Sequence, residues 1–275
     1  MGIRQKIQKM IAHLQNYTCL FLLLLSPVLQ AQDEGETYPY HLSWAVEVPI
    51  LSVGLGAGVG YLALHAQVEP LSEVALQGLD RSQVNVFDRS ATYNWSPTIA
   101  RVSDGVMAAG IALPLVLLAQ SRIRRTAPTV ALLAAETFIA VAGITNLVKP
   151  WILRPRPFVY NAAAPLAEKQ QKDAQYAFFS GHTSVTTAMC FMTAKVFHDY
   201  NPGHPARPWV WAGAATLSAT AGVLRHQAGK HFWTDIIAGY AVGAVIGVLV
   251  PELHRRPIFS VAAKVRPNVE FSFND

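Results

Sequence analysis

The chain alternates long apolar segments with polar ones of varied length. Five segments of about 16 to 20 residues hold at most one charged side chain each, and they lie at residues 104–120, 129–148, 182–197, 209–224 and 235–250. A helix needs about 20 apolar residues to cross the hydrocarbon core of a bilayer, so these segments are at the short end for membrane spans. Two of them are rich in Thr, Ser and Ala, which favours contacts with other helices over contacts with lipid.

A further apolar segment, residues 48–64, is rich in glycine. Its glycines alternate with other residues, at Gly54, Gly56, Gly58 and Gly60. Alternating glycines also occur in phosphate-binding loops, but no lysine follows these, so we expect close packing between membrane helices instead. Together with the five later segments, this one predicts an all-α fold, a membrane helix bundle of about six helices.

The polar stretches divide the chain into four parts: a signal peptide or N-terminal anchor (1–31), a lead-in (32–102), a core bundle (103–251) and a C-terminal tail (252–275). The first part has a basic start, a short apolar run and a small residue, Ala31, after which we expect cleavage. The lead-in holds the glycine-rich segment and a polar loop, residues 66–102, to which we assign no role. Alternating apolar residues in the tail, near Phe271, favour a short strand.

The composition supports a membrane protein and argues against some binding partners. Of the 275 residues, 52% are hydrophobic and 14% are charged, against about 25% charged in an average soluble domain. The net charge is +5, which we interpret as anion binding and membrane orientation and not as a nucleic-acid surface. Cys19 and Cys190 provide neither a disulfide framework nor a metal site, and we expect no metal and no cofactor.

Candidate chemistry is concentrated in residues 225–235, which read RHQAGKHFWTD. His231 and Asp235 are one helical turn apart, so on a helix they share a face. A carboxylate on one imidazole nitrogen would fix the tautomer and leave the other nitrogen free to attack or to take a proton. Arg225 adds a positive fork suited to a phosphate. Taken alone, the pattern also fits an arginine at a span end beside a surface ion pair.

Two other stretches favour the chemical interpretation. Residues 149–157 read KPWILRPRP, and residues 180–182 read SGH after a polar loop. In this order the three stretches resemble the motifs of the type 2 phosphatidic acid phosphatase superfamily, K-x6-R-P, P-S-G-H and S-R-x5-H-x3-D. That superfamily includes membrane lipid phosphatases, bacterial acid phosphatases and vanadium haloperoxidases. The resemblance covers roughly residues 100–250, with Phe179 in place of the usual proline and Leu224 in place of the usual serine.

The resemblance implies a role for each motif residue. His231 would be the nucleophile that forms a phosphohistidine, oriented by Asp235, and His182 would be the general acid and then the base. The equatorial oxygens of the phosphate would be bound by Lys149, Arg156, Ser180, Gly181 and Arg225. Ser180 could also be a helix N-cap, a role that is compatible with phosphate binding.

Counting the spans predicts that all three motifs meet at one membrane face. The opposite face receives the arginines of residues 121–125 and 255–256, and the positive-inside rule makes that face cytoplasmic. We therefore expect a multi-pass protein of a bacterial-type inner membrane, with the site facing the periplasm or exterior. Residues 48–64 would then have to start from the cytoplasm, which conflicts with a cleaved signal, so either the signal is an anchor or this segment does not span.

Several side chains near the motifs keep two interpretations. Arg154 is either a headgroup contact or a solvated charge, and Trp151 and Trp233 are expected in the aromatic belt at the membrane surface. Glu136, inside a predicted span, has either a functional role or a pairing role with Ser or Thr.

The membrane setting favours a lipid phosphate or a lipid diphosphate as the substrate, without selecting among them. The expected function is a membrane phosphatase that hydrolyses a phosphomonoester or diphosphate. The alternatives are a soluble periplasmic acid phosphatase, a vanadate-dependent haloperoxidase, and a membrane protein that only binds an anionic lipid.

Overall fold

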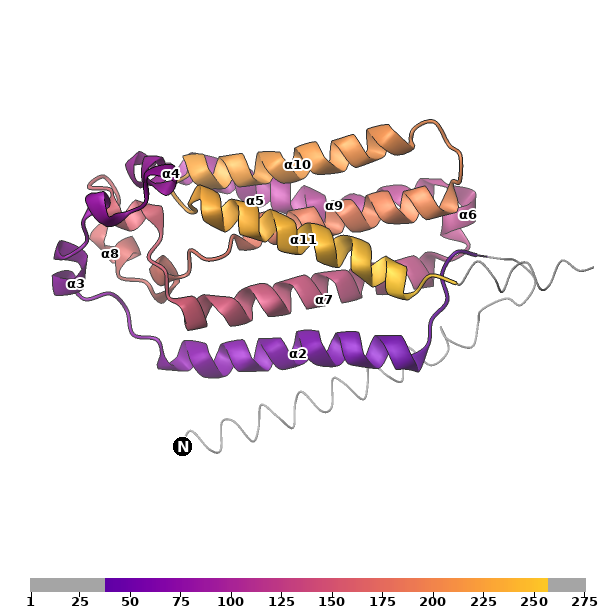
Figure 1. Cartoon of the computed structure of the whole chain (residues 1–275), viewed down its shortest axis with the longest axis horizontal. Helices are drawn as coiled ribbons and strands as arrows, with labels where there is room; N and C mark the ends of the chain where they lie inside the picture. Colours follow the sequence, from indigo (N-terminus) through magenta and orange to yellow (C-terminus); the bar gives the residue numbers. More distant parts are fainter. Residues whose placement is uncertain (1–37, 257–275) are drawn as a thin grey trace, which may run out of the picture.

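The computed structural model describes residues 38–256, and within that range it is a bundle of helices without a β-strand. Figure 1 shows long helices running side by side, with short helices gathered at the ends of the bundle. The long helices are α2 (Trp44–Gln67), α5 (Pro97–Ala112), α7 (Ala127–Ile152), α9 (Gly181–Tyr200), α10 (Arg207–Gln227) and α11 (Trp233–Leu253). The short ones are α3 (Glu73–Gln77), α4 (Val86–Arg89), α6 (Ser121–Arg124) and α8 (Leu166–Lys169). The all-α bundle predicted from the apolar segments is confirmed.

Within residues 38–256, four helices are long and apolar enough to cross a membrane. They are α2, α5 together with the 3-10 turn that continues it to Ala119, α7 and α11. Helices α9 and α10 have 20 and 21 residues but a more polar composition, so they fall outside this set. Helix α9 is the most enclosed of the long helices, and it contacts α5, α7, α10 and α11. The Thr-rich and Ser-rich segment thus packs against other helices, as its composition predicts.

Several hydroxyl groups of α9 have hydrogen-bond partners inside the bundle, whereas those of Thr186 and Thr187 have none among the described residues. Thr193 Oγ1 donates to the carbonyl of Met189 at 2.7 Å, and the hydroxyl groups of Ser184 and Thr145 are 2.9 Å apart. A buried polar group without a partner would cost roughly 1–3 kcal/mol, so these bonds lower the cost of burying a polar helix here.

Glycines on α11 bring its backbone against α9. A Cβ atom added to Gly239, Gly243 or Gly247 would lie 2.6, 2.3 or 2.4 Å from the carbonyl oxygen of Ser180, Ser184 or Ala188, respectively. Because these glycines are four residues apart, they form one stripe along the helix. The same device joins α2 to α7, where a Cβ on Gly143 would lie 2.4 Å from the Gly54 carbonyl. The glycine-rich segment is therefore a packed helix, as predicted.

Helix α2 begins at the end of the bundle where α11 finishes. The His41 amide donates to the His254 carbonyl at 2.9 Å. The His254 ring lies 3.4 Å from Glu47 and 3.1 Å from Glu136, and all three side chains are fully buried. Glu136 thus pairs with a histidine and not with a serine or threonine, which was one of the two interpretations that the sequence left open. The start of α2 lies at the arginine-rich end, as the span count requires.

The polar loop, residues 66–102, folds into short helical turns at the opposite end of the bundle, where all three motifs lie (Figure 1). It packs on the motif loops through hydrogen bonds such as Asn94 Nδ2 to the His226 carbonyl at 3.0 Å. The expected signal or anchor (1–31) and the expected strand near Phe271 lie outside the described residues.

We predict that Gly243→Ala destabilises the protein by about 1–3 kcal/mol, because the added methyl group meets the Ser184 carbonyl and the helices must separate. Unfolding of detergent-solubilised protein, followed by circular dichroism, measures this. Gly56→Ala is the matched control, because Gly56 is also helical and has open space around it. Equal stability of the two variants would contradict close α9–α11 packing.

Candidate active site

The spacing of Arg225 and His231 follows from the way α10 ends. Gly229 has a φ of +71°, and the Gly229 and Lys230 amides donate to the carbonyls of His226 and Arg225 at 2.9 and 3.0 Å. This pair of bonds around a left-handed glycine is the Schellman motif. It turns the chain back, so that the His231 amide also reaches the Arg225 carbonyl, at 3.3 Å. Five intervening residues are what this turn needs to bring His231 back to the end of α10.

Asp235 belongs to the first turn of α11. Its Oδ2 accepts a hydrogen bond from the Phe232 amide at 2.8 Å, as the third residue of a capping box does. Its carbonyl accepts from the Ser180 amide at 3.0 Å, which joins the start of α11 to the start of α9. The second and third motifs are therefore held together by main-chain bonds.

The first motif lies across the end of α7. Leu153 has a φ of +48° and ends the helix, after which residues 154–156 run extended beside residues 174–177. The Arg156 amide donates to the Ala174 carbonyl at 2.8 Å, and the Ala177 amide donates to the Arg154 carbonyl at 3.0 Å. This pairing turns the Arg156 side chain back toward His231.

The start of α9 contributes Ser180 and Gly181. The Ser180 side chain is fully buried and caps the helix by accepting from the Thr183 amide at 3.4 Å, so the N-cap role is observed. A Cβ on Gly181 would lie 3.2 Å from Lys149 Nζ, so the glycine leaves room for this ammonium group at the helix N-terminus. The free amides of a first turn, beside a lysine, are suited to binding an anion.

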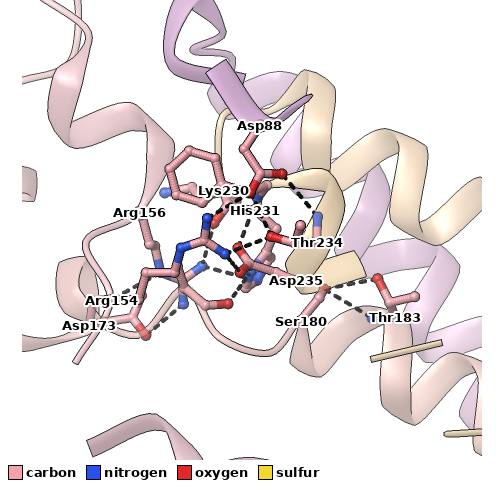
Figure 2. Close-up of polar contacts among 12 residues, drawn as sticks. Asp88, Arg154, Arg156, Asp173, Ser180, Thr183, Lys230, His231, Thr234 and Asp235 are labelled. Carbon is pink, nitrogen blue, oxygen red and sulfur yellow. Dashed lines mark hydrogen bonds and ion pairs between the residues drawn. The ribbon is translucent and has the colours of Figure 1, made fainter. Parts of the chain in front are cut away.

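Two hydrogen bonds fix the tautomer of His231. Its Nδ1 lies 2.7 Å from the Ala177 carbonyl, which can only accept, so Nδ1 carries the proton. Its Nε2 lies 3.3 Å from Arg156 Nη1, which can only donate, so Nε2 presents a lone pair. The ring is therefore neutral, and its basic nitrogen faces Arg156 (Figure 2).

The surroundings of His231 keep the ring neutral. The side chain is 1% exposed, and this burial is the main reason that its pKa lies well below the usual value. The positive charges of Arg156, Arg225 and Lys149 lower the pKa further. The ring is therefore a free base across the physiological pH range, as a nitrogen nucleophile has to be.

His182 has a carboxylate partner that the motifs do not reveal. Its Nε2 lies 2.7 Å from Asp104 Oδ1, and the same oxygen is 3.5 Å from Arg225 Nη1. Arg225 is 5% exposed and also donates to Ser103 at 3.1 Å. Asp104 is on α5, at one end of a predicted span, and only the fold brings it to residues 182 and 225. A charged residue at a span end was the one available sequence signal.

Asp235 does not form the expected hydrogen bond with His231. Its nearer oxygen is 3.6 Å from Nδ1, while Ala177 occupies that nitrogen at 2.7 Å. Asp235 instead forms a short ion pair with Arg154, which also binds Asp88 at 2.8 Å (Figure 2). Arg154 is thus neither a headgroup contact nor a solvated charge. Asp88 comes from the polar loop to which the sequence assigned no role.

The fold brings the predicted site residues together at one end of the bundle: Lys149, Arg156, Ser180, Gly181, His182, Arg225, His231 and Asp235. The tryptophans lie outside this group. Trp151 is 77% exposed, and Trp233 stacks on His226 with ring centroids 4.2 Å apart. The arrangement joins a neutral imidazole, three cations and a helix N-terminus, which together suit attack on a phosphate.

Comparison with known proteins agrees with the motifs. The family described as the PAP2 superfamily matches residues 130–258, a range that holds all three motifs and confirms their resemblance to that family. Phospholipid phosphatase 1 of Rattus norvegicus is 28% identical over 96 residues, which cover 34% of each chain, so the match spans about a third of that relative. A transmembrane PAP2-type phosphatidylglycerolphosphate phosphatase from Bacillus subtilis has a similar structure, with a TM-score of 0.46, 20% identity, and coverage of 79% of this chain and 99% of the other.

We predict that His231 stays neutral at pH 6, where a histidine with the ordinary pKa of about 6.5 is mostly protonated. Ring-nitrogen NMR of protein labelled at histidine, assigned by comparison with His231→Asn, should show an Nδ1–H tautomer. Below about pH 6.5 the His231 ring is protonated in the unfolded chain but not in the folded protein. This residue therefore lowers the free energy of unfolding as the pH falls below about 6.5. A doubly protonated His231 ring at pH 6 would contradict the site geometry.

Proposed function

We propose that the protein is a membrane phosphatase that hydrolyses a lipid phosphate or diphosphate through a phosphohistidine intermediate. The observation that carries this proposal is the buried, neutral ring of His231, whose Nε2 faces Arg156 at 3.3 Å with Arg225 and Lys149 close by. A nucleophile surrounded by fixed cations is what phosphoryl transfer needs, because negative charge on the equatorial oxygens must be stabilised.

In the first step the Nε2 lone pair attacks phosphorus, and the bond from phosphorus to the leaving oxygen breaks. His182 gives its proton to the leaving oxygen, so the alcohol or lipid phosphate departs neutralised by one proton. In the second step His182 takes a proton from water, the resulting hydroxide attacks phosphorus, and the P–N bond breaks. Inorganic phosphate is released and His231 is again neutral.

Asp104 serves His182 in both steps. With Nε2–H donated to Asp104 at 2.7 Å, Nδ1 is the nitrogen left to exchange a proton with the leaving group and with water. When His182 carries its proton, the nearby carboxylate offsets the positive charges of Arg225 and Arg156, which otherwise oppose that form.

A cavity beside the site supports a lipid substrate. Its volume is about 270 Å³, and it lies between α5, α7 and α9. Its lining includes the apolar side chains of Met107, Phe138, Ala142 and Val185 together with Gly181 and His182. Because α5 and α7 are long and apolar enough to span a membrane, a hydrocarbon chain could enter here with its phosphate at His182.

We also propose the orientation expected from the charges. The site end of the bundle faces the periplasm or exterior of a bacterial-type inner membrane. The supporting observation is that the arginines of α6 lie at the other end, where Arg122 binds the Tyr200 carbonyl at 3.2 Å.

Purified protein in detergent should release phosphate from a panel of lipid phosphates. His231→Ala should lower kcat at least about 1000-fold, because the nucleophile is lost. His182→Ala should be slower mainly on alkyl phosphates and should keep more activity on p-nitrophenyl phosphate, whose leaving group needs no proton. Phosphate release by malachite green assay measures this. Wild-type turnover in His231→Ala would rule out the histidine nucleophile.

A larger side chain in the cavity tests whether the cavity holds the hydrocarbon chain of a lipid substrate. Ala142→Phe should raise KM for a long-chain lipid phosphate at least about 10-fold and leave kcat/KM for p-nitrophenyl phosphate within about twofold, because the phosphate site is untouched. Ala131→Phe, an exposed alanine of the same helix, is the matched control. If Ala142→Phe affected neither substrate, the cavity would not hold the lipid chain.

A further inference from the structure

Two buried carboxylates share one arginine beside the site. Asp88 and Asp235 are both 0% exposed, and the Arg154 guanidinium lies between them. Burying a carboxylate without partners costs free energy, so each of these carboxylates has to lie where it can accept hydrogen bonds. These bonds are drawn in Figure 2.

Asp88 is fully satisfied and fixes the start of α11. One of its oxygens accepts from the Thr234 amide at 3.0 Å. The other accepts from the Thr234 hydroxyl at 2.6 Å, from Asn85 at 2.9 Å and from Arg154 at 2.8 Å. Burial by itself would raise the pKa of Asp88, but the hydrogen bonds from Thr234 and Arg154 hold it below its usual value. Asp88 is therefore an anion that holds Arg154 in place.

Arg154 in turn determines where the Asp235 carboxylate lies. Its Nη1 binds Asp235 Oδ1, and it donates to the Thr234 hydroxyl at 2.8 Å. The guanidinium carbon stacks over the Phe232 ring, 4.1 Å from the centroid, which fixes the plane of the fork. The other Asp235 oxygen takes the Phe232 amide at 2.8 Å and stays 3.6 Å from His231.

The main chain of Arg154 acts on the same histidine from the other side. Its carbonyl accepts the Ala177 amide at 3.0 Å, and the carbonyl of Ala177 is the acceptor for His231 Nδ1. One residue therefore holds both groups that compete for the Nδ1 proton, the carboxylate through its side chain and the carbonyl through its backbone.

We infer that Arg154, anchored by Asp88, is a positioning residue that keeps the Asp235 carboxylate off His231, so that Ala177 receives the Nδ1 proton. A carboxylate bonded directly to the ring would favour the imidazolium form, which has no lone pair to attack with. With Arg154 holding its other oxygen, the Asp235 carboxylate stays 3.6 Å from the ring, near enough to stabilise the positive ring that forms during transfer. The catalytic consequence rests on the proposed function, whereas the placement of the proton does not.

Charged and titratable groups face the His231 ring from several elements, and each bears on its protonation: Asp235 of α11, Arg156 of the extended segment, Arg225 of α10, Lys149 of α7 and His182 of α9. Four of these five are cations or a histidine and disfavour a second proton. Asp235 is the one carboxylate in the group, so its distance from the ring is the variable that Arg154 controls.

The test compares Arg154→Met and Arg154→Lys with wild type by ring-nitrogen NMR titration, and by kcat and KM for p-nitrophenyl phosphate. In Arg154→Met no cation holds Asp235 away from the ring, so Asp235 and His231 should bind a proton as a coupled pair. The pKa at which the His231 ring titrates should rise by about one unit, and kcat should fall at least about 10-fold. KM should change less than twofold. Arg154→Lys, which keeps the charge but can bind only one carboxylate well, should recover part of both losses.

Asp80→Asn is the matched control and should behave as wild type, because Asp80 is an exposed carboxylate of the same loop whose hydrogen bonds within the described residues go to Ser82. A His231 pKa and a kcat that are unchanged in folded Arg154→Met would overturn the inference. Should that variant not fold, Arg154→Lys decides: a wild-type pKa and kcat there would overturn it too. A raised pKa of His231 in Arg154→Met, together with a wild-type protein that hydrolyses no phosphate ester, would support the positioning role and refute the proposed function.

Discussion

The hydrogen bond from His231 Nδ1 to the Ala177 carbonyl is the interaction on which the site depends. It sets which nitrogen carries the proton and so leaves Nε2 as the basic nitrogen facing the cations. A main-chain acceptor suits this purpose, because an uncharged carbonyl orients the ring without drawing a second proton onto it. The bond exists only because the segment around Ala177 is paired with Arg154 and because the end of α10 folds His231 back.

The site gathers like charges at one place, and the rest of the bundle has to compensate for that. Arg156 and Arg225 are 4% and 5% exposed, and each has one carboxylate within 3.5 Å, Asp173 and Asp104 respectively. Fixed cations in a partly desolvated site are worth more to a developing negative charge than cations in water, and they do not have to reorganise during the reaction. Close packing elsewhere in the bundle, such as that of α9 and α11 along the glycine stripe, opposes this cost in stability.

The polar loop before α5 joins the chemistry to the bundle. Through Asp88 it binds both the start of α11 and Arg154, and through Asn94 it binds the end of α10. At the other end, His254 bridges Glu47 and Glu136 and secures α2 against α7 and α11. Both ends of the bundle are therefore closed by buried charges that are paired, as burial requires.

The apolar periods of the sequence determined the helical class and the end of the bundle at which the motifs meet, because these are local properties. The eight motif residues were predicted from the resemblance of three short stretches to family motifs. The Arg225 to His231 spacing, for instance, encodes a helix end with a left-handed glycine. Only the tertiary structure showed that Asp104, Asp88 and Arg154 belong to the site. Their partners lie 78, 66 and 81 residues away in the chain, so no local pattern marks them. The sequence also suggested that Asp235 would take the His231 proton, since one turn separates them. In the structure the Ala177 carbonyl accepts the hydrogen bond from His231 instead. Arg154 and the Phe232 amide hold the Asp235 carboxylate, and the main-chain carbonyl lies closer to the ring.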